Sequence, residues 1–98
     1  MPKAYWISTY QSISNPEALQ KYAALAGPAL MAAGGKFIAR GMPAAIFENA
    51  VMQRVVVIEF PSVAQAVAAY ESPAYKEATA FLTPGAVARE VRIVEGTE

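Results

Sequence analysis

The sequence predicts a single α+β domain in which helices cover one face of a four-stranded antiparallel sheet. Its 98 residues suit one domain with one modest core. Segments typical of strands and of helices alternate along the chain in the order β-α-β-β-α-β. One expected strand, Met52–Phe60, is apolar on both faces, which indicates that the sheet is covered on both sides.

The first half of the chain predicts a strand, a helix and a second strand. Ala4–Tyr10 is rich in aromatic and β-favouring residues, and Ser14–Glu17 combines a capping side chain, a proline and an acid, as at a helix start. Apolar residues then recur at helical spacing, at Leu19, Tyr22, Ala23, Ala26, Leu30 and Ala33. We expect Pro28 to kink or break this helix. Gly34-Gly35 should end it through left-handed conformations, before a strand at Lys36–Arg40.

The second half predicts the remaining two strands and two short helices. After Met52–Phe60, Ser62 and Gln65 form a capping box. The helix that follows should turn one stripe inward, made of Val63, Ala66, Val67 and Tyr70. Ser72-Pro73 opens a further helix, and the charged segment Ala86–Val94 is expected to form an edge strand. This order of elements is the split βαβ, ferredoxin-like arrangement.

The two apolar faces of the third strand predict a homodimer. Val56 and Ile58 lie on one face, and Val55 and Val57 lie on the other. Helices can cover only one of these faces, and each Val or Ile left in water forgoes roughly 1.5–3 kcal/mol. Over a whole sheet that sum rivals the ~5–15 kcal/mol stability of a domain. A second copy packed face to face would recover it, and so would another chain in a hetero-oligomer.

The composition excludes several classes of function. The chain has no Cys, no His and no Asp, which removes haem ligation, zinc sites, Ser-His-Asp triads and thiol nucleophiles. We therefore expect no cofactor and no metal. Charged residues make up only 16% and balance to zero, so we expect neither nucleic acid nor a membrane as a partner. No signal peptide or membrane span is recognisable, and a cytoplasmic location is the default expectation.

Five segments of the chain carry a family resemblance: AYWI at Ala4–Ile7, NPEA and a tyrosine within Asn15–Tyr22, GGKFIARG at Gly34–Gly41, RVVVIEFPS at Arg54–Ser62 and AAYESPAY at Ala68–Tyr75. Together, and in this order, they resemble the domain-of-unknown-function family 1330 (DUF1330), a member of the dimeric α+β barrel superfamily. The chain departs from the family pattern mainly at Met42–Val51 and Thr79–Ala88. The first is a loop, the second is more apolar than the family pattern, and either could alter the rim of a pocket.

The resemblance implies a dimeric α+β barrel built from two four-stranded sheets, and it implies no particular reaction. One interpretation is an uncharacterised homodimeric barrel that binds a small metabolite. The alternative is a cofactor-independent monooxygenase or isomerase that acts on a small apolar or anionic metabolite, as in related superfamily members. Whether the protein is an enzyme stays open at this point.

Arg40 and Glu59 are the candidate catalytic residues. Arg40 ends its strand beside Arg54 and Tyr10, and its fork of donors suits a carboxylate or enolate ligand. A salt bridge that pins a loop or joins two subunits is the structural alternative. Glu59 could act as a general base, or it could simply accept hydrogen bonds at a strand end. It should lie roughly 15 Å from Arg40, so the two should not form a dyad within one subunit.

The aromatic residues are further candidates for ligand contact. Trp6, Tyr22 and Tyr75, with Tyr70 beside them, could line a pocket for an aromatic or polyketide-like substrate. Packing in the core with satisfied hydroxyl groups is the structural alternative. A cavity of ~300 Å³ or more that reaches Arg40 or Glu59 would favour the enzyme.

Overall fold

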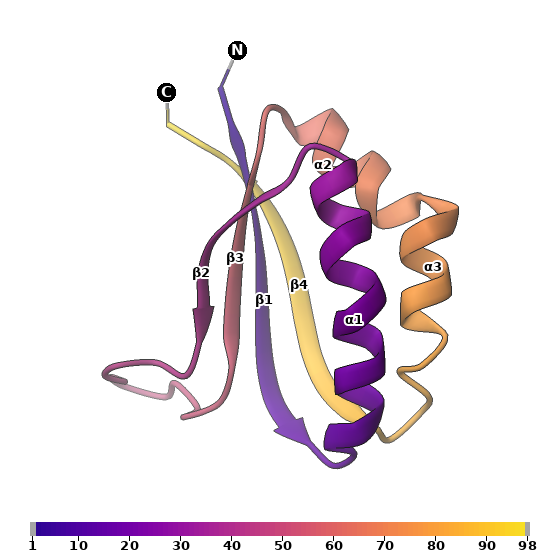
Figure 1. Ribbon diagram of the computed structural model, residues 1–98. Coiled ribbons are helices and arrows are strands. Elements are labelled where there is room, and N and C mark those ends of the chain that lie inside the picture. The colour runs from indigo at the N-terminus through magenta and orange to yellow at the C-terminus, as the bar shows by residue number, and fades with distance from the viewer. Residues whose placement is uncertain (1, 98) are drawn as a thin grey trace.

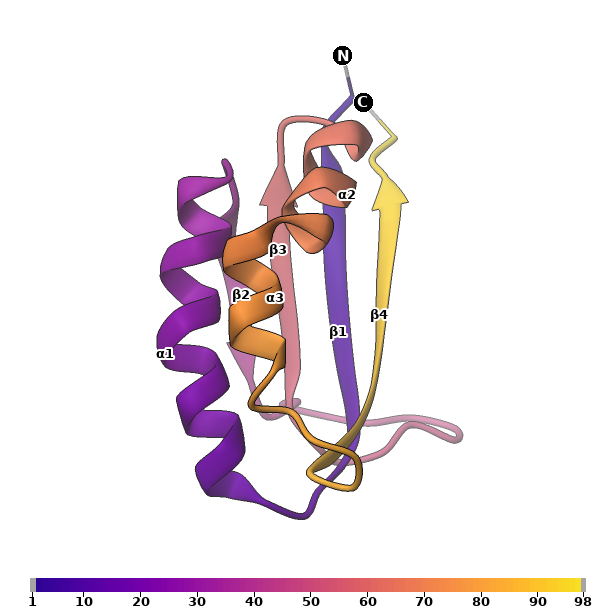
Figure 2. The ribbon, with the colours of Figure 1, turned by 90° about the vertical axis from the view of Figure 1, so that its right-hand side faces the viewer.

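The chain folds into two layers, a sheet and a layer of helices that all lie on the same face of it (Figures 1 and 2). The computed structural model describes residues 2–97. The strands within this range are β1 (Ala4–Ile13), β2 (Lys36–Gly41), β3 (Val55–Phe60) and β4 (Val87–Glu95). The helices are α1 (Pro16–Ala32), α2 (Val63–Glu71) and α3 (Pro73–Thr79).

The sheet has the strand order β2-β3-β1-β4, and every pair of neighbours is antiparallel. The long strand β1 lies in the interior of the sheet and pairs with β3 on one side and with β4 on the other. The predicted α+β class, ferredoxin-like element order and edge position of the last strand are confirmed. Because β1 and β4 pair along most of their lengths, residues from the two ends of the chain face each other across the sheet.

The third strand is shorter than predicted, since it begins at Val55 and not at Met52. The backbone N–H of Gln53 donates to the carbonyl of Val51 at 2.8 Å, which closes a tight turn. The Gln53 side-chain oxygen then accepts the backbone N–H of Arg54 at 2.9 Å. These local bonds take the donors that a strand ladder would need, so pairing starts at Val55.

The two faces of β3 meet different surroundings. Val56, Ile58 and Phe60 are buried beneath the helices, whereas Val57 lies opposite Ile7 and Ala39 on the other face. Within the described residues no helix or strand covers that other face, which we call the open face (Figure 1). The loop of residues 42–54 extends on the side of the open face. Its exposed apolar side chains are Met42, Ile46, Phe47, Val51 and Met52.

Side-chain caps start each helix where the sequence places them. Asn15 Oδ1 accepts the N–H of Ala18 at 3.1 Å, and the hydroxyls of Ser62 and Ser72 each accept a backbone N–H at 3.2 Å. The predicted break at Pro28 was wrong, because α1 continues through this proline to Ala32. Residues on both sides of the proline are buried, so tertiary packing holds the helix together there.

The inward stripe predicted for α2 was partly wrong. Ala66 and Ala69 are buried, whereas Val67 and Tyr70 are 39% and 44% exposed. Small alanine side chains face the sheet, which lets α2 lie close to it. Val67 and Tyr70 instead line a groove with Val91 and other residues beside the edge strand β4.

Candidate functional site

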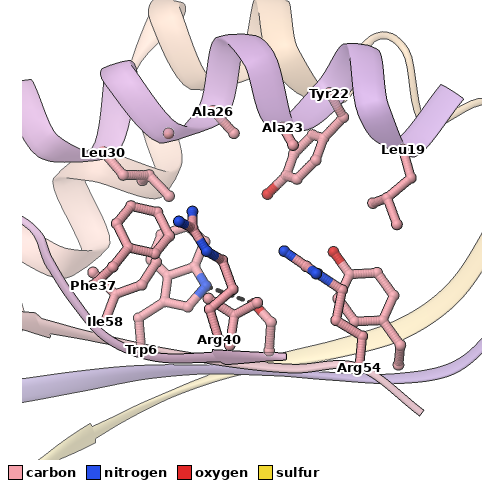
Figure 3. A pocket seen from close by; sticks show the side chains of 14 residues that line it. Trp6, Leu19, Tyr22, Ala23, Ala26, Leu30, Phe37, Arg40, Arg54 and Ile58 are labelled. Atoms are coloured by element: carbon pink, nitrogen blue, oxygen red, sulfur yellow. Dashed lines mark hydrogen bonds between the residues drawn. The ribbon is translucent and has the colours of Figure 1, made fainter. Parts of the chain in front are cut away.

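A pocket between α1 and the helix-facing side of the sheet gathers several of the predicted site residues (Figure 3). Its polar lining comes from Ser8, Tyr10, Tyr22, Arg40 and Arg54. Its apolar lining includes Trp6, Leu19, Leu30, Phe37, Val56 and Ile58. We call it the α1 pocket. The centres of water molecules could occupy about 40 Å³ of it, which is room for a few waters or a very small ligand.

A bulge in β2 directs Arg40 into this pocket. Phe37 lies opposite Ile58 and Arg40 lies opposite Val56, although the two residues are three positions apart. In a regular strand an odd separation would put them on opposite faces. The extra residue between Phe37 and Ala39 shifts the register and brings both side chains to the helix-facing side. The Arg40 guanidinium then lies 4.8 Å from the centre of the Phe37 ring.

Arg40 and Arg54 enter the α1 pocket without an acidic partner. In residues 2–97, the ion pairs within 4.0 Å are Lys3–Glu59 and Arg92–Glu90, and neither arginine of the pocket takes part in one. Figure 3 shows both guanidinium groups directed into the space below α1. The salt bridge considered for Arg40 within one subunit is therefore not formed with any described residue. Two positive groups share an apolar-walled space whose described lining holds no carboxylate.

Glu59 lies away from this pocket. Its carboxylate is 3.4 Å from the ammonium group of Lys3, and its side chain is 22% exposed. It pairs with Tyr5 on β1 and Lys36 on β2, at the opposite end of β3 from Val55. As expected from the strand positions, Arg40 and Glu59 do not come together. Glu59 forms an ion pair with Lys3 at this strand end, in place of the hydrogen bonds expected as its structural alternative.

Trp6 contributes an apolar wall. Its indole N–H donates to the buried Ser8 hydroxyl at 2.8 Å, so its polar atom already has a partner. Its ring lies 5.2 Å from Tyr75 in an edge-to-face arrangement and 6.1 Å from Phe60. Trp6 is only 1% exposed. It therefore serves the core and the pocket wall together.

Tyr22, Tyr75 and Arg89 form a cluster of hydrogen bonds behind the pocket. The two phenol oxygens lie 2.6 Å apart, although the residues are 53 positions apart in sequence. Arg89 donates to Tyr22 at 3.1 Å and to Tyr75 at 3.0 Å. Tyr22 lines the pocket, whereas Tyr75 does not belong to the lining and is 1% exposed. Tyr75, a predicted ligand contact, thus supports Tyr22 from behind.

Sequence analysis missed Arg89, which it treated as a charge on an edge strand. The available signal was the alternation in β4, where Arg89 shares its face with Val91 and Ile93 while Glu90 and Arg92 take the other. Arg89 lies opposite Tyr10 on β1, and Val91 and Ile93 lie opposite Ser8 and Trp6. A basic residue that shares a strand face with partly buried apolar residues is a candidate for a side chain that points toward the core.

Burial governs the ionisation of this cluster. Burial raises the pKa of Tyr22 above its usual range, and the neighbouring Tyr75 raises it further against the opposing charge of Arg89. Burial also raises the pKa values of Tyr10 and Tyr75. Burial alone would lower the pKa of Arg89, but Tyr22 and Tyr75 outweigh this effect and raise it. The phenols therefore stay protonated, and Arg89 stays charged, throughout the neutral range.

The raised pKa values predict a loss of stability at alkaline pH. Above pH 10 the unfolded chain releases phenol protons that folded Tyr10, Tyr22 and Tyr75 retain, so the free energy of unfolding falls as pH rises. The slope should approach about 1.4 kcal/mol per pH unit for each tyrosine that stays protonated. Urea titrations at pH 9, 10 and 11, with phenolate absorbance of the folded and unfolded states, measure this. Ionisation of all five tyrosines near pH 10 in the folded protein would contradict it.

A family model for a domain of unknown function (DUF1330) matches residues 3–97. The chain belongs to the DUF1330 family. The match spans every element from β1 to β4, which confirms the family resemblance. Among curated proteins, no relative matched this DUF1330 chain.

Solved structures of three bacterial proteins of unknown function resemble the DUF1330 chain. One from Rhodopseudomonas palustris is 21% identical with a TM-score of 0.73, and the match covers 99% of this chain and 84% of that one. A dimeric ferredoxin-like protein from Thermobifida fusca is 14% identical with a TM-score of 0.66, covering 96% and 91%. A nipsnap family protein from Agrobacterium tumefaciens is 14% identical with a TM-score of 0.61, covering 96% and 87%. At these identities the likeness supports the ferredoxin-like fold alone.

Two other features are absent from the described part of the DUF1330 chain. Over residues 2–97, no helix combines the length and the hydrophobicity that crossing a bilayer requires. The same residues contain no cluster of three or more His, Cys, Asp or Glu side chains placed to hold a metal ion.

Proposed function

We propose that this DUF1330 protein is a homodimeric binding protein for a small organic carboxylate, held in the α1 pocket. The observation that carries the proposal is the pair of guanidinium groups, Arg40 and Arg54, that reach one apolar-walled pocket without an acidic partner in residues 2–97. A planar guanidinium presents parallel donors that match the two oxygens of a carboxylate. Such a ligand would supply the negative charge that the pocket lacks.

The dimensions of the pocket support a short-chain acid. About 40 Å³ is far below the ~300 Å³ or more typical of sites for larger organic ligands. Leu30, Phe37 and Ile58 would contact a short alkyl chain, while the carboxylate meets the arginines nearer the opening. The small volume favours a binding protein over the enzyme considered from the sequence.

A catalytic role has less support. The monooxygenase or isomerase alternative needs a proton acceptor beside the ligand. Glu59 lies at the other end of β3, and the tyrosines of the pocket have raised pKa values, so they act as donors at neutral pH. We therefore assign Arg40 and Arg54 to ligand binding and give Glu59 no part in the site.

Thermal shifts with butyrate, butyramide and butylamine test the binding proposal. Butyrate at ten times its dissociation constant should stabilise the unmodified protein by about 1.4 kcal/mol, and its neutral and cationic analogues should do less. Arg40→Ala and Arg54→Ala should each reduce the butyrate shift. Lys21→Ala removes the same charge from the exposed side of α1 and should leave it unchanged. Equal shifts from butyrate and butyramide in the unmodified protein would rule out carboxylate binding.

The open face supports the homodimer. Ile7, Val55 and Val57 lie on the face of the sheet that no described element covers, and the apolar loop of residues 42–54 extends on the same side (Figure 1). A second copy would remove this surface from water. The related Thermobifida fusca protein is described as dimeric. Light scattering should therefore give twice the 10.4 kDa mass of one chain. The cytoplasmic location expected from the sequence stays a prediction.

A further inference from the structure

The cluster of Tyr22, Tyr75 and Arg89 contains more hydrogen-bond donors than acceptors. A guanidinium offers five N–H groups and accepts nothing, while each phenol has one O–H and one oxygen. Three bonds join the groups: one between the phenol oxygens at 2.6 Å and one from Arg89 to each of them. The phenol–phenol bond uses one hydroxyl hydrogen. The other hydroxyl hydrogen therefore has no acceptor within the cluster, whichever tyrosine donates.

The positions of the two phenols determine which of them can donate this hydrogen to a ligand in the α1 pocket. Tyr75 is 1% exposed, packs against Trp6 and Tyr22, and lies outside the lining of the α1 pocket. Tyr22 lines that pocket, and Figure 3 shows its oxygen directed into the space between α1 and the sheet. If Tyr75 donates to Tyr22, the remaining hydrogen belongs to Tyr22 and can be offered to a ligand.

With Tyr75 as the donor, Tyr22 cannot accept a further hydrogen bond from a ligand. A phenol oxygen has two acceptor positions. Arg89 occupies one at 3.1 Å, and Tyr75 occupies the other when it is the donor of the 2.6 Å bond. Tyr22 can then act toward the pocket only as a donor. An ammonium group or an N–H of a ligand would find no acceptor on it.

Arg89 adds positive charge at the same place. Its guanidinium lies 4.9 Å from the centre of the Tyr22 ring and 5.9 Å from that of Tyr10. In residues 2–97 it has no carboxylate within 4.0 Å, and its hydrogen-bonded side-chain partners there are tyrosines. A half-buried cation that no acid neutralises favours a negatively charged acceptor nearby.

We propose that Tyr22 is a ligand-binding residue that donates its hydroxyl hydrogen to a carboxylate oxygen, with Arg89 and Tyr75 as the residues that orient it. This inference rests on the proposed carboxylate-binding function and adds the third donor, opposite Arg40 and Arg54. It also predicts selectivity, since the two orienting residues make this wall of the pocket a hydrogen-bond donor. The ligand class is a small carboxylate, preferred over an amine of the same size.

A matched pair of variants tests the proposal. Tyr22→Phe and Tyr75→Phe each remove one hydroxyl of the same 2.6 Å bond, and each takes one acceptor from Arg89. Their losses of melting temperature should be similar. Butyrate affinity, measured by calorimetry, should fall about tenfold or more in Tyr22→Phe, as for a lost hydrogen bond to a charged group. In Tyr75→Phe the affinity should fall less than in Tyr22→Phe, because Tyr22 keeps its own hydroxyl hydrogen and loses only one of the two groups that orient it.

Arg89→Met tests the orienting role separately. Without the guanidinium, one acceptor position of Tyr22 becomes open, so Tyr22 can accept from a ligand as well as donate to it. The ratio of butyrate affinity to butylamine affinity should fall at least fivefold, and far-ultraviolet circular dichroism checks that the variant is folded. An unchanged ratio in a folded variant would remove Arg89 from the proposal. If this variant does not fold, the comparison of the two tyrosine variants decides.

The outcomes separate the two proposals. Equal weakening of butyrate binding by Tyr22→Phe and Tyr75→Phe would overturn the donor role of Tyr22. If Arg40→Ala and Arg54→Ala weaken binding while Tyr22→Phe does not, the carboxylate site stands and this inference fails. If the unmodified protein does not prefer butyrate over butyramide, both proposals are overturned.

Discussion

Val57→Asp should convert the protein from a dimer into a folded monomer. Val57 lies on the open face between Ile7 on β1 and Ala39 on β2, so in a face-to-face dimer its side chain would be buried against the partner. A carboxylate there would lose its hydration, and the two-fold symmetry would bring in a second one. In the monomer the same position is partly exposed to water, where the change should lower the free energy of unfolding by about 1 kcal/mol or less. Light scattering should show the mass falling to 10.4 kDa.

Ile58→Asp is the matched control on the next residue. Ile58 is 1% exposed and faces the helices, so its carboxylate would be buried without a partner inside one chain. This variant should lose its folded circular dichroism signal. The two substitutions introduce the same charge one position apart and should fail in different ways. A Val57→Asp protein that remains dimeric with unchanged melting would show that the open face is not the interface.

Among substitutions that add one methyl group, Gly35→Ala should be the most destabilising. It should lower the free energy of unfolding by about 3 kcal/mol. A Cβ atom at this position would lie 2.8 Å from the carbonyl oxygen of Leu30, 2.9 Å from the ring of Phe60 and 3.0 Å from Ile58. The first contact is with backbone of α1, which cannot rotate away. The C-terminal end of α1 would therefore have to move from the sheet. Urea denaturation measures the loss.

Gly34→Ala provides the comparison for Gly35→Ala. Gly34 has φ of +101°, and the nearest atom to an added Cβ would belong to the flexible side chain of Gln65 at 3.4 Å. Its substitution should cost roughly 1–2 kcal/mol through backbone strain alone. The sequence interpretation of two left-handed glycines was right for Gly34 and wrong for Gly35, which is needed for close packing. Losses of equal size in the two variants would contradict this distinction.

Features that depend on neighbouring residues could be predicted from the sequence. The caps at Asn15, Ser62 and Ser72 were recognisable because each side chain bonds a backbone group only three residues away. The two-sided apolar pattern of Val55–Phe60 was recognisable because strand side chains alternate with a period of two. The strand order followed from these elements and from the ferredoxin-like topology.

The candidate site was predicted only in part. Placing Arg40 near Arg54 and Tyr10 was correct, because strand ends that lie at one edge of the sheet follow from the topology. The sheet face to which Arg40 points could not be predicted from the sequence. A bulge of one residue reverses the alternation of side chains between the two faces, and the segment KFIARG carries no clear signal of that bulge. The position of Tyr75 behind the pocket lining could not be predicted from local patterns either, because it depends on how α3 packs against α1.

The amino-acid order alone determined the element types, their succession, the family and the surplus of apolar sheet surface, since each of these is recorded in local spacing or in a simple inventory of residue types. Only the folded chain decided that Tyr22, Tyr75 and Arg89 meet, because their contacts join α1, α3 and β4 across 14 to 67 residues. Hydrogen bonds over such separations depend on angles and distances between whole elements, and those arise from packing.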